Sequence, residues 1–122
     1  MEEYLIIPNR QECVRIASDD IVYIMSDVNY SKIYIPNVLG DTPYLATITI
    51  GEVGKALYDQ LTKSAGNFIR VGGQLIINKQ HLFSISLTNG NIGLLFPTGI
   101  HYVPASKEAL RTLMGIIDKK LV

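Results

Sequence analysis

The sequence predicts a mainly β fold: a β sandwich of about ten short strands with one mid-chain helix and one C-terminal helix. Three observations predict it. Short runs rich in Ile, Val and Tyr recur along the chain, Asp, Asn, Gly and Pro bound these runs, and only two segments carry apolar residues at helical spacing. With 122 residues, 48% of them hydrophobic, and no linker or repeat, we expect a single domain over residues 1–122.

The expected strands follow one another from the N-terminus onward. They lie at residues 4–7, 13–17, 21–25, 30–35, 44–49, 68–71, 75–77, 82–87, 92–96 and 101–103. The clearest hairpin joins strands near 82–88 and 91–96. Asn89-Gly90 between them is typical of a type I′ turn, which needs positive φ at both central residues.

The mid-chain helix is predicted from a start signal and an apolar period. Thr49 followed by Glu52 has the spacing of a capping box, in which each side chain bonds the backbone N–H of the other residue. Apolar residues then recur at helical spacing, and Gly66 offers a C-terminal stop. The apolar positions are Ile50, Val53, Leu57 and Leu61.

The C-terminal helix is predicted to begin at Ser106, which follows Pro104 and has the side chain of an N-cap. Its apolar stripe is Leu110, Leu113, Met114, Ile117 and Leu121. Lys119 and Lys120 suit the negative C-terminal end of the helix dipole. The stripe is expected to pack on the core, and a partner surface is the alternative.

Composition argues against several classes of protein. The longest uncharged stretch is broken by polar residues, so no segment approaches the roughly 20 apolar residues of a membrane span. The start, Met-Glu-Glu, lacks the basic region of a secretory signal, so we expect the chain to remain in the cytoplasm. Cys13, His81 and His101 make no zinc ligand set, and no nucleophile stands in a catalytic motif. We expect no metal, no cofactor and no enzymatic activity.

Charge is balanced overall but unevenly distributed. Lysine plus arginine and aspartate plus glutamate each number 11, which gives no general basic footprint for nucleic acid. Residues 1–27 are nevertheless strongly acidic, whereas residues 60–107 contain no acid and carry Lys63, Arg70, Lys79 and Lys107. This asymmetry could place a modest positive face opposite an acidic one.

Three blocks of the sequence, in this order and spacing, resemble the LytTR family of bacterial DNA-binding domains. Residues 20–30, D-I-V-Y-I-M-S-D-V-N-Y, resemble the opening block D-I-x-Y-I-E-A-x-x-N-Y. Residues 68–78, F-I-R-V-G-G-Q-L-I-I-N, resemble the more specific F-x-R-V-H-R-S-x-I-V-N. Residues 104–107, P-A-S-K, resemble the P-V-S-R before the last helix. The resemblance covers about residues 12–115 and implies an elongated, mainly β fold.

The resemblance implies that loops rather than a recognition helix contact double-stranded DNA, in two successive major grooves and the minor groove between them. The positions that carry over are Asn29, Tyr30, Ser31, Lys32, Gly72, Gly73, Gln74, Asn78, Lys79, Ser106 and Lys107, with Arg70 as a further cation for the phosphate backbone. The family's use of paired repeats implies a dimer on DNA.

The match to the family pattern weakens at two of the expected contact sites. Gly72-Gly73 replaces the usual His-Arg pair, and Lys107 replaces an arginine, so a bidentate fork is missing at both places. The two glycines also fit a turn that needs unusual φ, and Asn78 fits a buried strand end better than a base reader. Lys79 is the better contact candidate.

The sequence therefore predicts a sequence-specific transcriptional regulator of the response-regulator type. Lys32, Arg70, Lys79 and Lys107 are expected on phosphates, with Tyr30, Gln74 or Lys107 reading bases. The alternative is an interaction module of the same fold that has lost DNA affinity and binds a protein partner through its C-terminal helix or a sheet edge.

Overall fold

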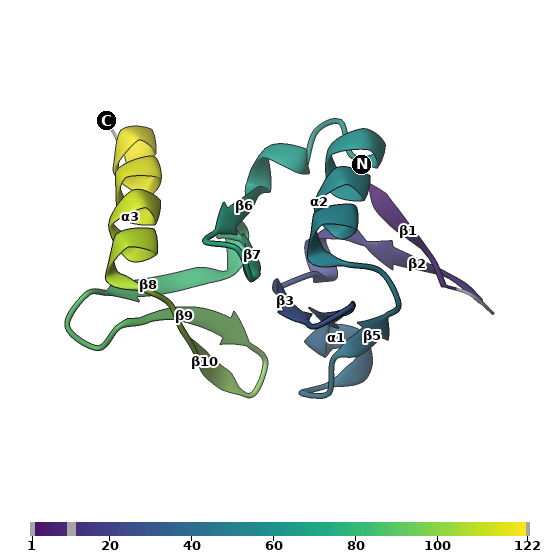
Figure 1. Cartoon of the computed structure of the whole chain (residues 1–122), viewed down its shortest axis with the longest axis horizontal. Helices are drawn as coiled ribbons and strands as arrows, with labels where there is room; N and C mark the ends of the chain where they lie inside the picture. The colour runs from purple at the N-terminus through teal and green to yellow at the C-terminus, as the bar shows by residue number, and fades with distance from the viewer. Residues whose placement is uncertain (1, 10–11, 122) are drawn as a thin grey trace.

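A computed structural model of the chain describes residues 2–9 and 12–121 (Figure 1). In chain order its α-helices and strands are β1 (Tyr4–Pro8), β2 (Cys13–Ala17), β3 (Tyr23–Asp27), β4 (Tyr30–Tyr34), α1 (Pro36–Leu39), β5 (Tyr44–Ala46), α2 (Ile50–Gln60), β6 (Phe68–Val71), β7 (Leu75–Asn78), β8 (Leu82–Ser86), β9 (Asn91–Phe96), β10 (Gly99–Pro104) and α3 (Lys107–Leu121). The mainly β class is confirmed, and every predicted strand is present.

A five-stranded sheet, in the order β5-β4-β3-β7-β6, forms the middle of the described chain. Side chains alternate between its two faces, as the pleat of a strand requires. On β7, Ile76 belongs to one hydrophobic core while Leu75 and Ile77 belong to the other. Both faces are thus covered, which explains why this strand is a continuous apolar run instead of an alternating one.

The first core lies between this sheet, α2 and the β1–β2 hairpin. α2 begins as the sequence predicts, because Thr49 Oγ1 accepts from the Glu52 N–H at 3.2 Å and Glu52 Oε1 accepts from the Thr49 N–H at 3.1 Å. The predicted end is wrong. α2 stops at Gln60 instead of continuing toward Gly66, because Leu61 is extended and the Glu3 carboxylate binds the next three backbone N–H groups, those of residues 62–64.

The second core lies between the opposite face of the central sheet, α3 and the sheet β10-β9-β8. Ser106 caps α3 as predicted, since its Oγ accepts from the Ala109 N–H at 3.1 Å. Leu110 and Leu113 are fully buried, which confirms these positions of the stripe as core. Met114 is half-buried and Ile117 packs at the edge of the core. The side chains of Lys119, Lys120 and Leu121 lie outside the described residues.

Stacked aromatic rings join the central sheet to β9 in the second core. Tyr23 stacks on Tyr34 with ring centroids 4.1 Å apart, and Phe96 packs against both. Burial, reinforced by the neighbouring Tyr34, raises the pKa of Tyr23 well above its ordinary value. The Tyr23 hydroxyl therefore stays neutral at physiological pH.

Two local predictions need correction. The β8–β9 hairpin exists, but its loop has four residues, 87–90, and is closed by the Gly90 N–H donating to the Ser86 carbonyl at 2.9 Å. Gly90 has φ 68°, whereas Asn89 keeps negative φ, so the turn is not type I′. A further helix, α1, was not predicted. It is a single turn that starts at Pro36, a residue whose fixed φ suits a first helical position.

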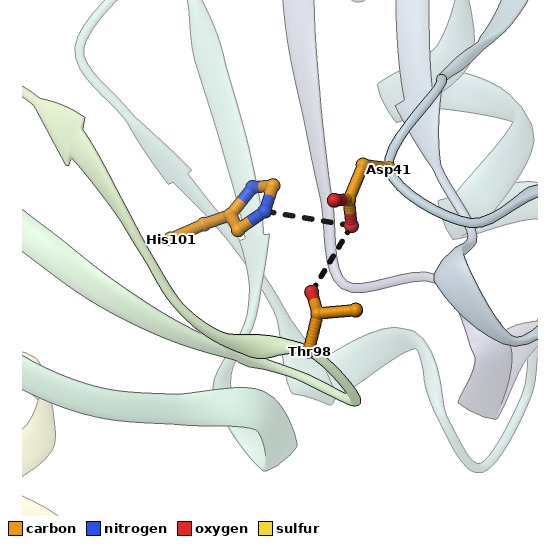
Figure 2. A network of polar contacts seen from close by, with 3 residues as sticks. All are labelled: Asp41, Thr98 and His101. Carbon is orange, nitrogen blue, oxygen red and sulfur yellow. Dashed lines mark hydrogen bonds and ion pairs between the residues drawn. The ribbon is translucent and has the colours of Figure 1, made fainter.

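A polar bridge fastens the loop after α1 to the β9–β10 hairpin (Figure 2). The Asp41 carboxylate lies 3.7 Å from His101 Nε2 and accepts a hydrogen bond from Thr98 at 3.2 Å. The His101 ring also stacks on Phe96, with centroids 3.5 Å apart. The bridge therefore connects a segment beside the first core to a strand that covers the second.

Candidate nucleic-acid interface

Two of the turns predicted to contact DNA lie side by side at one end of the central sheet. β3 and β7 are antiparallel with Met25 opposite Leu75, so the end of β3 meets the start of β7. The Ser26 N–H donates to the Gln74 carbonyl oxygen at 2.9 Å. The β3–β4 turn and the β6–β7 turn are thereby held together by backbone hydrogen bonding.

The β3–β4 turn is short and projects its side chains into solvent. Asp27 pairs with Tyr30, which leaves Val28 and Asn29 as the connection. Val28 has φ 57° and is 85% exposed, and Tyr30 is 50% exposed. A β-branched residue at positive φ is strained, and nothing in its packing compensates for this strain. No residue pattern around Val28 indicates this conformation.

The β6–β7 turn depends on its two glycines in different ways. Gly72 has φ 63°, the left-handed conformation that glycine adopts without a Cβ penalty, and a Cβ there would lie 3.9 Å from Ala109. Gly73 has ordinary φ and open space where a side chain would stand. Arg70 Nη2 donates to the Gly73 carbonyl at 2.9 Å and holds the turn from the preceding strand. This bond was not predictable from spacing alone.

The start of α3 lies against the same β6–β7 turn. Ser106 and residues 72–74 together line a shallow cavity of about 240 Å³. Ser106 uses its hydroxyl oxygen as the N-cap, and the exposed Lys107 is the first residue of the helix. The unpaired N–H groups and positive dipole end of a helix start favour an anion such as a phosphate. We call residues 28–30, 72–74 and 106–107 the turn cluster.

Charge around the turn cluster is mixed. Lys32, on β4, is half-buried, and its Nζ lies 3.7 Å from the Asp27 carboxylate. Arg70 is exposed and directs one guanidinium N–H group to Gly73. Glu108 lies beside Lys107 in the first turn of α3. An approaching phosphate therefore meets Lys32 already paired with a carboxylate, which lowers the affinity expected from that cation.

Three predicted contact residues lie outside this surface. Ser31 is fully buried and donates to the Ile48 carbonyl, and Asn78 is 1% exposed, donates to the Ile21 carbonyl and accepts from the Gln80 N–H. Neither side chain can reach DNA without losing these bonds, and Asn78 confirms the strand-end interpretation. Lys79 follows Asn78 at the opposite end of β7 from the turn cluster. The β alternation that buries Ser31 could have been read from the sequence, since Ile33 shares its face.

The comparisons with known proteins agree with this fold. Residues 11–118 match the profile of the LytTr DNA-binding domain family. A search of curated proteins gave no match. Among solved structures, the chain is similar to the LytTr DNA-binding domain of a Bacillus cereus protein described as a methyl-accepting/DNA response regulator. The TM-score is 0.63 and the identity 14%, and the alignment covers 96% of this chain and 98% of the other.

Within residues 2–9 and 12–121, no helix is long and apolar enough to cross a bilayer. The family profile spans nearly the whole chain and includes all three blocks that form or flank the turn cluster. The chain belongs to the LytTR family of DNA-binding domains, and this membership implies DNA binding by a transcription regulator.

Proposed function

We propose that the chain binds specific double-stranded DNA through the turn cluster, with loops and a helix start entering the grooves in place of a recognition helix. The observation that carries this proposal is the hydrogen bond from the Ser26 N–H to the Gln74 carbonyl, because it holds two turns from distant parts of the sequence at one exposed edge. The start of α3 lies against the second of these turns.

Phosphate contacts are proposed for two kinds of group. Lys32, Arg70 and Lys107 supply charge, and Gly72 and Gly73, both exposed residues without side chains, supply backbone N–H groups. The N-terminus of α3 adds its dipole. Lys79 can serve only a phosphate away from the turn cluster, since it lies at the other end of β7.

Base reading is proposed for Asn29, Tyr30 and Gln74, and for Lys107 on guanine. All four are exposed, and an amide such as that of Gln74 can pair with both edge groups of adenine. With no arginine at positions 72, 73 and 107, these contacts are fewer than the family pattern provides. Two chains on paired repeats about one helical turn apart would compensate by binding as a dimer.

The rival function is a protein-interaction module that uses the C-terminal helix. Burial of Leu110 and Leu113 in the second core supports DNA binding over this rival, because those positions of the stripe are occupied inside the chain. A DNA-binding regulator acts where the DNA is, so we place the protein in the bacterial cytoplasm. We propose no catalytic role.

A salt titration on mixed genomic DNA fragments tests the proposal. About three cations per domain should displace counterions and give a slope near −3 for log affinity against log salt concentration. Fragments selected at moderate salt should then share paired repeats. A slope near zero on every fragment, with the protein folded, would instead favour the protein-interaction module.

A further inference from the structure

A groove with an apolar floor and a cationic rim lies between α2 and the β6–β7 edge of the central sheet, outside the turn cluster. Leu57, Phe68 and Ile76 line its apolar part, with Gly54 on the helix side. Its volume is about 360 Å³, within the range of roughly 300–1,000 Å³ that small-molecule sites occupy. The groove is therefore large enough for one small organic ligand.

Glycine leaves this space open. A Cβ at Gly54 would stand 3.6 Å from Ile76 Cδ1 and 4.0 Å from Arg70 Nη1, which are ordinary contacts. Its φ is not in the left-handed region, so the helix would accept an alanine there, and alanine is the better helix former. The missing side chain at position 54 is therefore not required by the backbone, and it keeps the groove unfilled.

The rim of the groove has one sign of charge. Lys55 and Arg70 both line it, and among the described residues that form its wall none carries a carboxylate. Arg70 uses one N–H group of Nη2 on Gly73, and a guanidinium has five N–H donors, so further donors remain for an anion. Charge complementarity thus selects an anionic group attached to an apolar body.

We propose that this groove binds a small monocarboxylate with a flat or chain-like apolar body, held by Lys55 and Arg70, and that occupation weakens DNA binding. The second half rests on the proposed function, in which Arg70 contacts a phosphate. A carboxylate on the groove side of Arg70 neutralises that charge, and Arg70 also holds the Gly73 carbonyl of the turn cluster. Arg70 thus links the ligand-binding groove to the DNA-binding edge.

Direct binding to the full chain, without DNA, tests the site. The probe is 2-naphthoate, the uncharged control compound is 2-naphthamide, and the readouts are calorimetry and amide chemical shifts. Naphthoate should bind roughly fivefold more tightly than naphthamide, because the two rim cations are exposed and solvent screening keeps their contribution modest. The largest shifts should fall on α2 and β6. Equal binding of the two compounds, or shifts elsewhere, would overturn the site.

Variants of the groove sharpen this test. Gly54→Leu should abolish naphthoate binding by filling the cavity, whereas Gly115→Leu, at an exposed helix glycine with open space around it, should bind as the parent does. If Gly54→Leu does not fold, Gly54→Ala should weaken binding and Lys55→Gln should weaken naphthoate but not naphthamide by about threefold. Unchanged binding in these variants contradicts the proposal.

The coupling is tested separately on DNA. Saturating 2-naphthoate should weaken DNA binding by about threefold and reduce the salt slope, because one phosphate-facing charge is neutralised. The same addition should leave the Gly54→Leu protein unaffected. Naphthoate that binds the groove without changing DNA affinity would overturn the coupling, and a protein that binds naphthoate but no DNA would overturn the proposed function while keeping the site.

Discussion

Arg70 Nη2 donates a hydrogen bond to the carbonyl oxygen of Gly73, 2.9 Å away, across the turn that joins β6 to β7. This bond fixes the position of a backbone segment that has no side chains of its own to fix it. It also means that Arg70 has two separable roles at the proposed interface: it supplies charge, and it positions the glycine turn.

Substitution of Arg70 separates these roles. Arg70→Lys keeps the charge but loses the planar fork, so DNA affinity should fall by about 1 kcal/mol while the salt slope stays the same. Arg70→Gln removes the charge as well, so the salt slope should become less steep, by about one. The measurement is a salt titration of both variants. Identical slopes for glutamine and lysine at this position would show that Arg70 contacts no phosphate.

The two glycines of the turn should respond differently to substitution. Gly72→Ala places a Cβ at positive φ and should lower the free energy of unfolding by about 1–2 kcal/mol. Gly73→Ala should change it by less than about 0.5 kcal/mol, since the space around that position is open. Urea denaturation of the matched pair checks this, and equal losses would contradict the assigned conformations.

A cation restored at position 73 should strengthen DNA binding. Gly73→Arg fits the backbone, and its guanidinium should add about 1–3 kcal/mol if it reaches a guanine edge or a narrow groove. The family's neighbouring histidine is best left out, because position 72 has φ 63°. Fluorescence anisotropy on a selected site measures the gain. Unchanged affinity of the folded variant would place this turn away from DNA.

The strained Val28 offers a test of the neighbouring β3–β4 turn. Val28→Gly relieves a β-branched residue at φ 57° and loses little packing, so the protein should become more stable by about 0.5–1 kcal/mol. Val38→Gly is a suitable control, because Val38 is 61% exposed but has ordinary helical φ in α1. That control should be destabilising. If the unfolding temperature shifts in the same direction for both variants, strain at Val28 is contradicted.

Acid stability should depend on Glu3. Its carboxylate accepts from the Ser64 hydroxyl, from the backbone N–H groups of Thr62 and Ser64 and from the Thr62 hydroxyl, which together hold its pKa well below the ordinary value of 4.5. A lowered folded-state pKa contributes stability above pH 4.5, and this contribution is lost as the pH falls below that value. Glu3→Gln should flatten this loss, which begins at about pH 5 and continues down to the lowered folded-state pKa. Glu2→Gln, at an exposed carboxylate, should not.

Much of the fold was accessible from the sequence because local patterns and burial agree. The capping box at Thr49, the N-cap at Ser106 and the β-rich runs depend on residues close in the chain. One error arose where a distant residue decides, because α2 ends early where Glu3 binds the segment after it. The other arose from length, because α1 is a single turn started by one proline and is too short to show a helical period.

The candidate site was partly predictable for the same reason. Motif positions identified the turns, but they could not distinguish Asn29 and Gln74, which point to solvent, from Ser31 and Asn78, which are buried. The Arg70–Gly73 bond and the conformation of Val28 left no mark in the residue pattern. Both depend on backbone geometry that composition does not specify.

Lys107→Glu tests most directly whether the turn cluster binds DNA, with Lys63→Glu as the matched charge reversal outside it. At the first position of α3 a carboxylate is favoured by the helix dipole, so Lys107→Glu should be as stable as the parent or more stable by about 0.3–1 kcal/mol. Its DNA affinity should nevertheless fall by at least about 2 kcal/mol, or thirtyfold, and by much more than that of Lys63→Glu. Preserved stability with unchanged DNA affinity would contradict DNA binding through this surface.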